Sequence, residues 1–317
     1  MSDFTDRPQI GVSACLARQP VRFDGCFISN QFVNNECSTF FDLHTVCPEV
    51  EMGLGIPRPV IQLRDFEGEI RLVYSKDPEK QITHEMREFS ERKLKCLPPL
   101  DGFIFKKDSP SCGVHKVPVK NNKSGMRIRN GIGVFAQAFK ESYPQVPTED
   151  EGRLNDKGIR ENFLERVYAH YRWRQIAESG NPLKSFRDYH KNYKLILMAK
   201  DNSAYRQLGR MVASVNNKNF EEVSKQYFKL FMQAMSRIPS HGHHVNVMMH
   251  LLGFLKDKLN KKDKAELLEW FETYREDRVT RVTPLMLLQH HFNTHQNDYI
   301  ADQYYFSPFP SKLMLPV

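Results

Sequence analysis

Three cysteines in the first half of this 317-residue chain each stand where a short apolar run ends. Cys15 closes the run IGVSAC, Cys47 closes LHTVC, and Cys112 follows the run GFIF inside a Ser-Pro-Ser-Cys-Gly motif. Runs of this length are typical of buried strands. Because ligands of open α/β sheets bind beyond the carboxyl ends of the strands, we expect the three thiols to converge at that edge.

Strands and helices alternate through the first 150 residues. We expect strands at residues 9–15, 40–46 and 102–105, a hairpin at 60–74 with a Gly-containing turn, a helix at 83–94 capped by Thr83, a basic loop at 116–129 and a helix at 131–143. This order predicts an α/β fold built on an open, mostly parallel, Rossmann-like sheet with right-handed crossovers.

The second half shows no strand pattern. Residues 144–152 have the composition of a linker, which divides the chain into domains at 1–150 and 151–317. Helical patterns then occupy residues 162–178, 182–200, 202–216, 220–236, 243–259, 261–274 and 284–296, while the proline-containing tail at 304–317 is expected to be irregular. We therefore expect an all-α second domain.

Charge is divided between the halves in the same way. Residues 1–150 hold equal numbers of basic and acidic side chains, so the later residues carry the whole net charge of +8, together with nine of the twelve histidines. A neutral domain with all six cysteines, joined to a basic domain, suggests a chemical domain and a domain that binds a polyanion such as nucleic acid. A basic face that is merely solvated is the alternative.

Cysteine use points to metal binding or catalysis more than to disulfides. The N-terminus has no signal-peptide pattern and no apolar run is long enough for a membrane helix, so we expect a cytoplasmic protein with reduced thiols. Cys26, Cys37 and Cys96 lack a surrounding motif and are expected to be structural. No two cysteines are spaced as in a zinc knuckle. Three isolated thiols suit an iron–sulfur cubane with one open iron better than zinc, but spacing alone leaves both open.

Five sequence blocks, spread over residues 8–148, resemble the thiouracil desulfidase family. They are GVSACL from Gly11, VRFDG from Val21, VCPEV from Val46, GLGIPR from Gly53 and KDSPSCG from Lys107. The later segments HHVNVMMH from His243, TPLMLLQHH from Thr283, and residues 304–310 resemble the helical domain often fused to this family. The fusion looks like the two-domain enzymes that remove sulfur from 4-thiouridine in transfer RNA.

The resemblance implies roles for particular residues. Cys15, Cys47 and Cys112 match the ligands of a [4Fe-4S] cluster, whose fourth iron binds the sulfur of the substrate. Glu49 matches an acid/base carboxylate and Ser109 a catalytic serine. Without the resemblance, Glu49 would be interpreted as a helix cap and Ser109 as a turn residue. Residues Ala17 and Arg18 depart from the pattern, since a small residue such as Gly is expected there.

Further polar residues are candidates for binding. Substrate contacts are expected from Ser13, Asp24, Arg58, Ser111 and Lys116. Contacts to RNA are expected from Arg166, Arg172, Arg174, Lys191, Lys194, His243 and His250, because cations interleaved with aromatic rings suit RNA. The alternative for the aromatic part of this pattern, Trp173 above all, is an ordinary place in a helical core.

The sequence thus predicts an iron–sulfur enzyme that converts 4-thiouridine in tRNA to uridine and releases sulfide, as a monomer or small homo-oligomer. Two alternatives remain. One is a non-catalytic iron–sulfur redox sensor or RNA-binding adaptor, which would not need Glu49. The other is a desulfidase acting on free 2- or 4-thiouracil.

Overall fold

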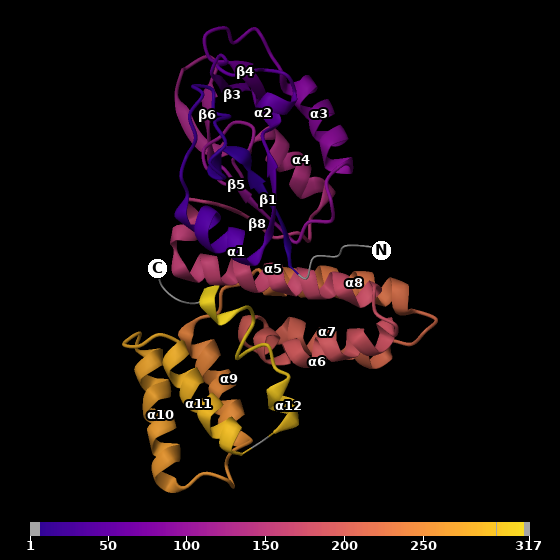
Figure 1. Ribbon diagram of the computed structural model, residues 1–317, viewed down its shortest axis with the longest axis vertical. Coiled ribbons are helices and arrows are strands. Elements are labelled where there is room, and N and C mark those ends of the chain that lie inside the picture. The colour runs from indigo at the N-terminus through magenta and orange to yellow at the C-terminus, as the bar shows by residue number, and fades with distance from the viewer. Residues whose placement is uncertain (1–6, 296, 314–317) are drawn as a thin grey trace. The chain divides into compact units, whose positions relative to one another are not determined.

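A computed structural model describes residues 7–295 and 297–313 of the chain. The chain divides into two compact units, Met1–Phe163 and Leu164–Val317. The indigo-to-magenta ribbon in Figure 1 is the first unit, which combines strands and helices, and the orange and yellow ribbon belongs to the second, which is helical. Each unit is described by itself below.

The first unit is organised around a parallel sheet. Its strands are β1 (Gln9–Ser13), β2 (Asp42–Val46), β5 (Gly102–Phe105) and β8 (Thr148–Asp150), in the spatial order β2-β1-β5-β8. All three pairings are parallel, which confirms the predicted fold class. Every residue of β5 is buried, as expected for a central strand that is covered on both faces.

Aromatic packing holds the helices of this unit to the sheet. The rings of Phe103 and Phe105 on β5 are stacked with 4.0 Å between their centroids. The ring of Phe139, from α4 (Val134–Ser142), meets that of Phe103 edge-on at 4.9 Å. Helix α3 (Thr83–Lys95) runs beside α4 (Figure 1). Burial of these large rings supplies much of the energy that holds the sheet and helices together.

Thr83 does not cap α3 as predicted. The residue at the cap position is Ile82, and no side chain accepts a hydrogen bond there. Instead the Thr83 hydroxyl accepts a 2.8 Å hydrogen bond from the backbone N–H of Leu72. The hydroxyl therefore ties the start of the helix to a neighbouring strand, a tertiary contact that competes with capping.

A second, mixed sheet lies in the same unit. Its strands are β3 (Ile61–Phe66), β4 (Glu69–Tyr74), β6 (Val117–Asn121) and β7 (Arg127–Gly131), in the order β4-β3-β6-β7. The predicted hairpin at 60–74 is confirmed. The predicted basic loop at 116–129 is wrong, because most of it forms the antiparallel hairpin β6–β7. Four of the five residues of β7 are exposed, so the strand has no apolar face that a sequence pattern could reveal.

The expected linker at 144–152 contains strand β8, which completes the parallel sheet beside β5. Its residues Glu149 and Asp150 are buried, at 6% and 1% exposure. Arg153 satisfies both: its Nε donates to Glu149 Oε1 at 2.8 Å, and its backbone N–H donates to Asp150 Oδ1 at 2.8 Å. His115 Nε2 also lies 2.8 Å from Glu149 Oε1.

Shorter elements complete the first unit. They are the 3₁₀ turn Ala14–Leu16, the π-helical segment Phe32–Cys37, α1 (Ser38–Phe40), α2 (Pro48–Glu51) and the 3₁₀ turn Arg153–Asn155. The first of these turns follows β1 and α2 follows β2, so both lie just beyond the carboxyl ends of parallel strands.

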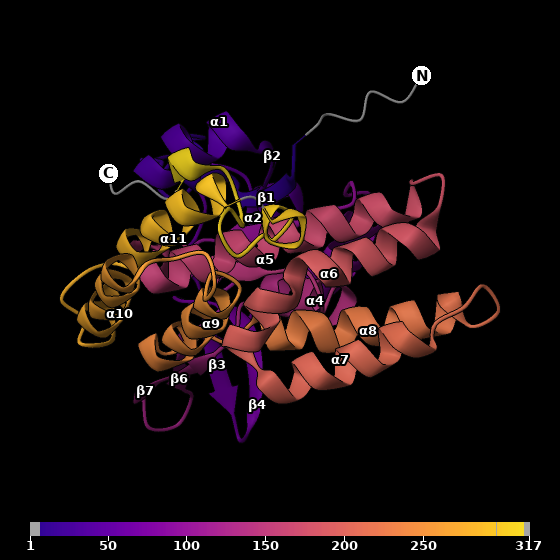
Figure 2. The same cartoon turned by 90° about the horizontal axis from the view of Figure 1, so that it is seen from below.

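The second unit is all-α, as predicted. Its helices are α5 (Lys157–Ala177, which begins in the first unit), α6 (Pro182–Lys200), α7 (Asn202–Ser214), α8 (Phe220–Met235), α9 (His241–Gly253), α10 (Lys261–Arg275), α11 (Val282–Thr294) and α12 (Asp298–Ala301), followed by a 3₁₀ turn at Ser311–Leu313. Figure 2 shows α6, α7 and α8 packed together, and α9, α10 and α11 together. In the part of the chain that is described, none of these helices could cross a bilayer.

Aromatic and charged side chains fill the core of the helical unit. The Trp173 indole stacks on Phe228 with centroids 4.5 Å apart, so the core interpretation of this tryptophan is correct. A buried ion-pair network lies in the same unit. Glu165 Oε2 is 2.8 Å from Lys200 Nζ, and Glu165 Oε1 is 3.3 Å from Arg281 Nη2.

Candidate functional site

The three predicted cysteines line one cavity of about 310 Å³. Cys15 lies in the turn after β1, Cys47 stands between β2 and α2, and Cys112 lies in the loop after β5. These three strands are neighbours in the parallel sheet. The convergence expected from the strand ends is therefore what the structure shows.

The loop that carries Cys112 is held in place by Ser109. The Ser109 hydroxyl accepts hydrogen bonds from the backbone N–H groups of Ser111, at 3.3 Å, and Cys112, at 3.1 Å. The N–H of Gly113 donates to the Ser109 carbonyl at 2.7 Å, and a Cβ at Gly113 would lie 2.7 Å from that carbonyl oxygen. Only glycine fits this close approach. Ser109 thus has the predicted turn-forming role, and its side chain also lines the cavity.

The turn after Cys15, where Ala17 and Arg18 depart from the family pattern, contains a residue with a positive φ. Arg18 has a φ of 60°, in the left-handed region that glycine adopts most easily. Arg18 therefore adopts a backbone conformation that a glycine would favour. The Cys15 carbonyl accepts a hydrogen bond from the N–H of Ile28 at 2.9 Å, which ties this turn to the following segment.

Burial disfavours the ionised form of all three thiols. It raises the pKa of Cys15 to about 11, although the charge of Lys106 opposes this shift. Burial and then the charge of Glu49 raise the pKa of Cys112 far above its ordinary value. Burial also raises the pKa of Cys47, partly offset by the N–H of Val50 and the charge of Arg58. Three acidic groups that oppose one another's ionisation need a central cation before they can act together as thiolates.

The Glu49 carboxylate faces the same cavity and is held on both oxygens. Oε2 accepts from Arg58 Nε and Nη2, each at 2.8 Å. Oε1 accepts from the Ser111 hydroxyl at 2.5 Å. The Ser109 and Ser111 hydroxyl oxygens are 3.0 Å apart, and since Ser111 donates to the carboxylate, its oxygen accepts from Ser109. Ser109, Ser111 and Glu49 thus form a hydrogen-bonded chain that ends beside the thiols.

The helix-cap interpretation of Glu49 does not hold in this structure. The carboxylate that caps α2 belongs to Glu51, whose Oε1 accepts from the Cys47 N–H at 2.9 Å. Glu51 also pairs with Lys93 at 2.7 Å. Glu49 instead faces the cavity, where its Oε2 accepts from Arg58 and its Oε1 accepts from Ser111.

The predicted substrate-binding residues divide into two groups. Ser13, Arg58 and Ser111 line the cavity. Asp24 and Lys116 are not among its lining residues. Asp24 is exposed and accepts from the Cys26 N–H at 3.0 Å, which makes it a turn residue. Lys116 is exposed and has a left-handed φ of 46° just before β6.

The predicted RNA-binding residues also divide. Arg172 donates to the Tyr193 hydroxyl at 2.8 Å and the Pro308 carbonyl at 2.7 Å, and it lies over the Tyr304 ring, so its guanidinium serves the helical core. Lys191 pairs with Asp302 at 2.9 Å on the surface. Arg166, Arg174 and Lys194 are partly buried, whereas His243 and His250 are exposed on α9.

Sequence reasoning missed three cations at the cavity wall, Arg22, Lys106 and Lys107. Lys106 directly follows β5, and its ammonium pairs with Glu151. The signal that could have found Lys106 is its position: a charged residue at the carboxyl end of a fully buried strand lies where ligands of α/β sheets bind.

The distances between the thiols limit which metal group the cavity can hold. Among the described residues, His115, Glu149 and Asp150 form a group whose possible metal-ligand atoms all lie within 4.8 Å of one another. The three cavity cysteines do not form such a group. Two thiolates bound to one zinc ion at about 2.3 Å stand at most about 4.6 Å apart. At least one pair of the three thiols is therefore farther apart than two ligands of one zinc ion. The His115 group is already balanced by Arg153.

Comparison with known families defines what kind of domains these are. Residues 10–151 match the family model 2-thiouracil desulfurase, and residues 194–310 match a family described as a protein of unknown function, DUF1722. The chain therefore carries a thiouracil desulfurase domain followed by a DUF1722 domain.

Two known proteins are similar to parts of the chain. The uncharacterized protein YbgA of Escherichia coli (strain K12) is 25% identical over 163 residues, which are 51% of this chain and 96% of that protein. The solved structure of the [4Fe-4S]-dependent thiouracil desulfidase TudS shares 28% identity, covers 47% of this chain and 94% of its own, and gives a TM-score of 0.36.

Proposed function

We propose that this protein removes sulfur from 4-thiouridine in tRNA, with a [4Fe-4S] cluster held by Cys15, Cys47 and Cys112. The observation that carries the proposal is that these three thiols and the Glu49 carboxylate line one cavity inside a domain that matches the 2-thiouracil desulfurase family. The cysteines are all free thiols, which agrees with the cytoplasmic location that we propose.

The residues present fit such a cluster. Three thiols come from three separate strand ends, and burial opposes their ionisation unless a cation joins them. When bound, the cluster would supply an iron without a protein ligand, which would act as a Lewis acid toward the thiocarbonyl sulfur. The reaction balances as thiocarbonyl plus water giving carbonyl plus hydrogen sulfide.

The chain's own residues move the protons. Glu49 lies two residues after Cys47. Its Oε2 accepts two bonds from Arg58, whereas its Oε1 accepts one from Ser111 and keeps a lone pair. The carboxylate accepts a proton from the attacking water and then donates it to the departing sulfur, as a general base and then a general acid. Arg58 holds Oε2 with two donors and Ser111 holds Oε1, so the two residues together fix the orientation of the carboxylate.

Ser109 and Ser111 complete the proposed machinery. Their hydroxyls form a chain that points to Glu49, so they hold the carboxylate toward the cavity and offer a hydrogen bond to water or to the base. Burial of Cys112 and Ser111, at 6% and 0% exposure, limits access of bulk water to this side of the cavity. A low-dielectric surrounding strengthens each of these contacts.

The helical unit supports tRNA as the substrate. The excess of basic over acidic residues lies entirely after residue 150. We propose that Arg166, Arg174, Lys191, Lys194, His243 and His250 contact the RNA, and we leave out Arg172 because its guanidinium is used inside the unit. Such cations would position the polyanion and would not read its sequence.

The test is direct turnover. The protein is purified without oxygen and incubated with thiolated tRNA while the absorbance of the thiocarbonyl group is followed. We expect the absorbance to disappear with release of an equal amount of sulfide. If free thiouracil is converted and thiolated tRNA is not, the substrate part of the proposal is wrong. If neither is converted by cluster-loaded protein, the enzymatic proposal is wrong and a sensor or adaptor is favoured.

A further inference from the structure

A second, larger cavity of about 1060 Å³ adjoins the thiol-lined cavity of about 310 Å³. It lies over the mixed sheet, and we call it the sheet groove. Both cavities are lined by Arg58, Val60, Ile61, Asp108 and Pro110, so they share a wall. Arg58 stands at this wall and holds Glu49 from it. A molecule whose base lies in the thiol cavity would therefore extend into the sheet groove.

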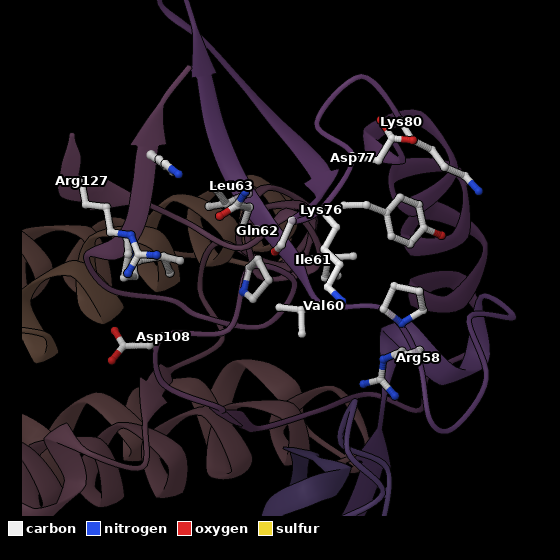
Figure 3. Close-up of a pocket in the computed structure, with 17 residues that line it drawn as sticks. Arg58, Val60, Ile61, Gln62, Leu63, Lys76, Asp77, Lys80, Asp108 and Arg127 are labelled. Carbon is white, nitrogen blue, oxygen red and sulfur yellow. The ribbon is translucent and has the colours of Figure 1, made fainter. Parts of the chain in front are cut away.

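Cations predominate in the lining of the sheet groove. Besides Arg58, it contains Lys76, Lys80, Lys120 and Arg127, against two carboxylates, Asp77 and Asp108. Figure 3 shows Arg127 and Asp108 toward one side of the groove, Arg58 and Lys80 toward the other, and Lys76 between them. Asp108 is bound by Arg129, which offsets its charge.

In the described part of the chain, four of the groove cations have no carboxylate partner, unlike several other cations of the first unit. Lys93, Lys106, Lys123, Arg129 and Arg153 each form an ion pair with a carboxylate. Within residues 7–295 and 297–313, no ion pair with a carboxylate involves Lys76, Lys80, Lys120 or Arg127. Uncompensated cations around one concave surface attract a polyanion.

An aromatic side chain completes the groove. Tyr74, at the end of β4, lines it, and the Lys80 ammonium lies 5.0 Å from the Tyr74 ring centroid. Cations beside an aromatic ring are the usual elements of single-stranded nucleic-acid sites, where rings stack on bases and cations hold phosphates. A free base is too small to use this surface.

We propose that the sheet groove binds the sugar–phosphate backbone that flanks the thiolated uridine, with Lys76, Lys80, Lys120 and Arg127 as phosphate contacts. This inference rests on the proposed function and adds to it that the desulfurase domain itself prefers a single-stranded polynucleotide to a free base. Lys120 and Arg127 belong to the hairpin β6–β7, so this hairpin forms part of the substrate site.

The test compares two full-length variants with the same loss of charge. In the groove variant, Lys76, Lys80, Lys120 and Arg127 are changed to Gln. In the control, the exposed residues Arg87, Arg92, Lys95 and Lys140 of α3 and α4 are changed to Gln. Both are loaded with cluster and assayed on free 4-thiouracil and on a single-stranded oligonucleotide that contains 4-thiouridine.

We expect the groove variant to raise the KM for the oligonucleotide roughly 10- to 100-fold and to reduce the slope of log KM against log salt by about 3, as four lost phosphate contacts require. Its turnover of free thiouracil should equal that of the control. If both variants have the same KM and the same salt slope, the groove does not bind RNA. That result leaves the proposed function intact, whereas failure of the unmodified protein on every thiolated substrate would reject the proposed function itself.

A measurement on the unmodified protein tests the proposal even if the groove variant fails to fold. The KM is compared for 4-thiouridine nucleoside, its 5′-phosphate, and short oligonucleotides with the thiouridine at a fixed position. We expect the KM to fall as flanking phosphates are added and to rise again with salt. Equal KM values across this series would overturn the proposal without any substitution.

Discussion

The thiol cavity of the first unit and the ion-pair network of the second unit both bury ionisable side chains, with opposite arrangements. In the network, Glu165 meets Lys200 and Arg281, so each charge faces its opposite, and these cations hold the pKa of Glu165 below its ordinary value. In the cavity, three thiols gather beside a carboxylate that is already paired with Arg58, and the charges of Glu49, Cys15 and Cys47 all raise the pKa of Cys112.

The difference separates buried charges that stabilise the fold from buried groups that can take part in a reaction. A buried group with an opposite partner needs nothing further, and its removal costs stability. A cluster of like groups beside a cavity is unfavourable until something positive joins it, and such sites are candidates for function. Four predictions test this contrast between the buried thiols and the buried ion-pair network.

Replacing Cys112 with Ser should reduce desulfidation of thiouracil to the background rate, because the cluster would lose one of three protein ligands. Turnover under anaerobic conditions measures this. The control is Cys96→Ser, since Cys96 is exposed and does not line the cavity. Equal activity of both variants would mean that the cavity thiols have no part in the chemistry.

Replacing Glu49 with Gln should lower kcat by about 10²- to 10⁴-fold, the usual contribution of a general acid–base group, while iron content stays unchanged. The control is Glu51→Gln in the same short helix. Its amide oxygen still accepts from the Cys47 N–H, and only the pair with Lys93 is weakened. We expect this control to keep its activity within about threefold, since such partly exposed pairs contribute little. A Glu49→Gln protein with full turnover would show that Glu49 is not the general acid–base group.

Replacing Glu165 with Gln should lower the free energy of unfolding by about 3–5 kcal/mol, because Lys200 and Arg281 would remain buried without their carboxylate. Denaturant titration measures this. Turnover of free thiouracil by the folded variant should be unchanged. The exposed Glu221 of α8, paired with Lys225, serves as the control, and Glu221→Gln should leave the unfolding curve in place. A stable Glu165→Gln protein would contradict the structural role of the network.

Acid should destabilise the protein through two buried histidines. Burial lowers the pKa of His190 to about 4 and that of His244 to about 2. In the unfolded chain both have a pKa near 6.5 and bind protons that the folded state does not, so stability falls as the pH drops below that value. Between pH 6.5 and 5.5 we expect a loss of about 1 kcal/mol for each histidine.

Denaturant titrations at several pH values measure this slope. The double variant His190→Gln/His244→Gln should show a flatter dependence than the unmodified protein over the same range, whatever its absolute stability. A slope that the double substitution leaves unaltered would show that these histidines are not held neutral in the folded state.

The sequence predicted the elements whose apolar pattern matches their burial. The runs before Cys15, Cys47 and Cys112 form neighbouring strands because each is apolar along most of its length, and the thiols follow from strand order. The helices of the second unit were also predicted closely, since helical periodicity persists over many turns.

The errors occurred where burial and residue type disagree. Strand β7 exposes four of its five residues, so nothing in its sequence distinguishes it from a basic loop. Strand β8 contains the buried residues Glu149 and Asp150, whose propensity opposes a strand and whose partner Arg153 becomes visible only in three dimensions. The contact between Glu49 and Arg58, and the wall shared by the two cavities, likewise depend on tertiary structure.

The central claim is that Cys15, Cys47 and Cys112 jointly hold one iron–sulfur cluster. Its most direct test is to count iron and acid-labile sulfide per chain in protein prepared without oxygen, for the unmodified chain and for Cys15→Ser, Cys47→Ser and Cys112→Ser. We expect about four of each per unmodified chain and a marked loss of both in every variant. A single metal ion without sulfide, or a full complement of iron and sulfide in any of the three variants, would contradict it.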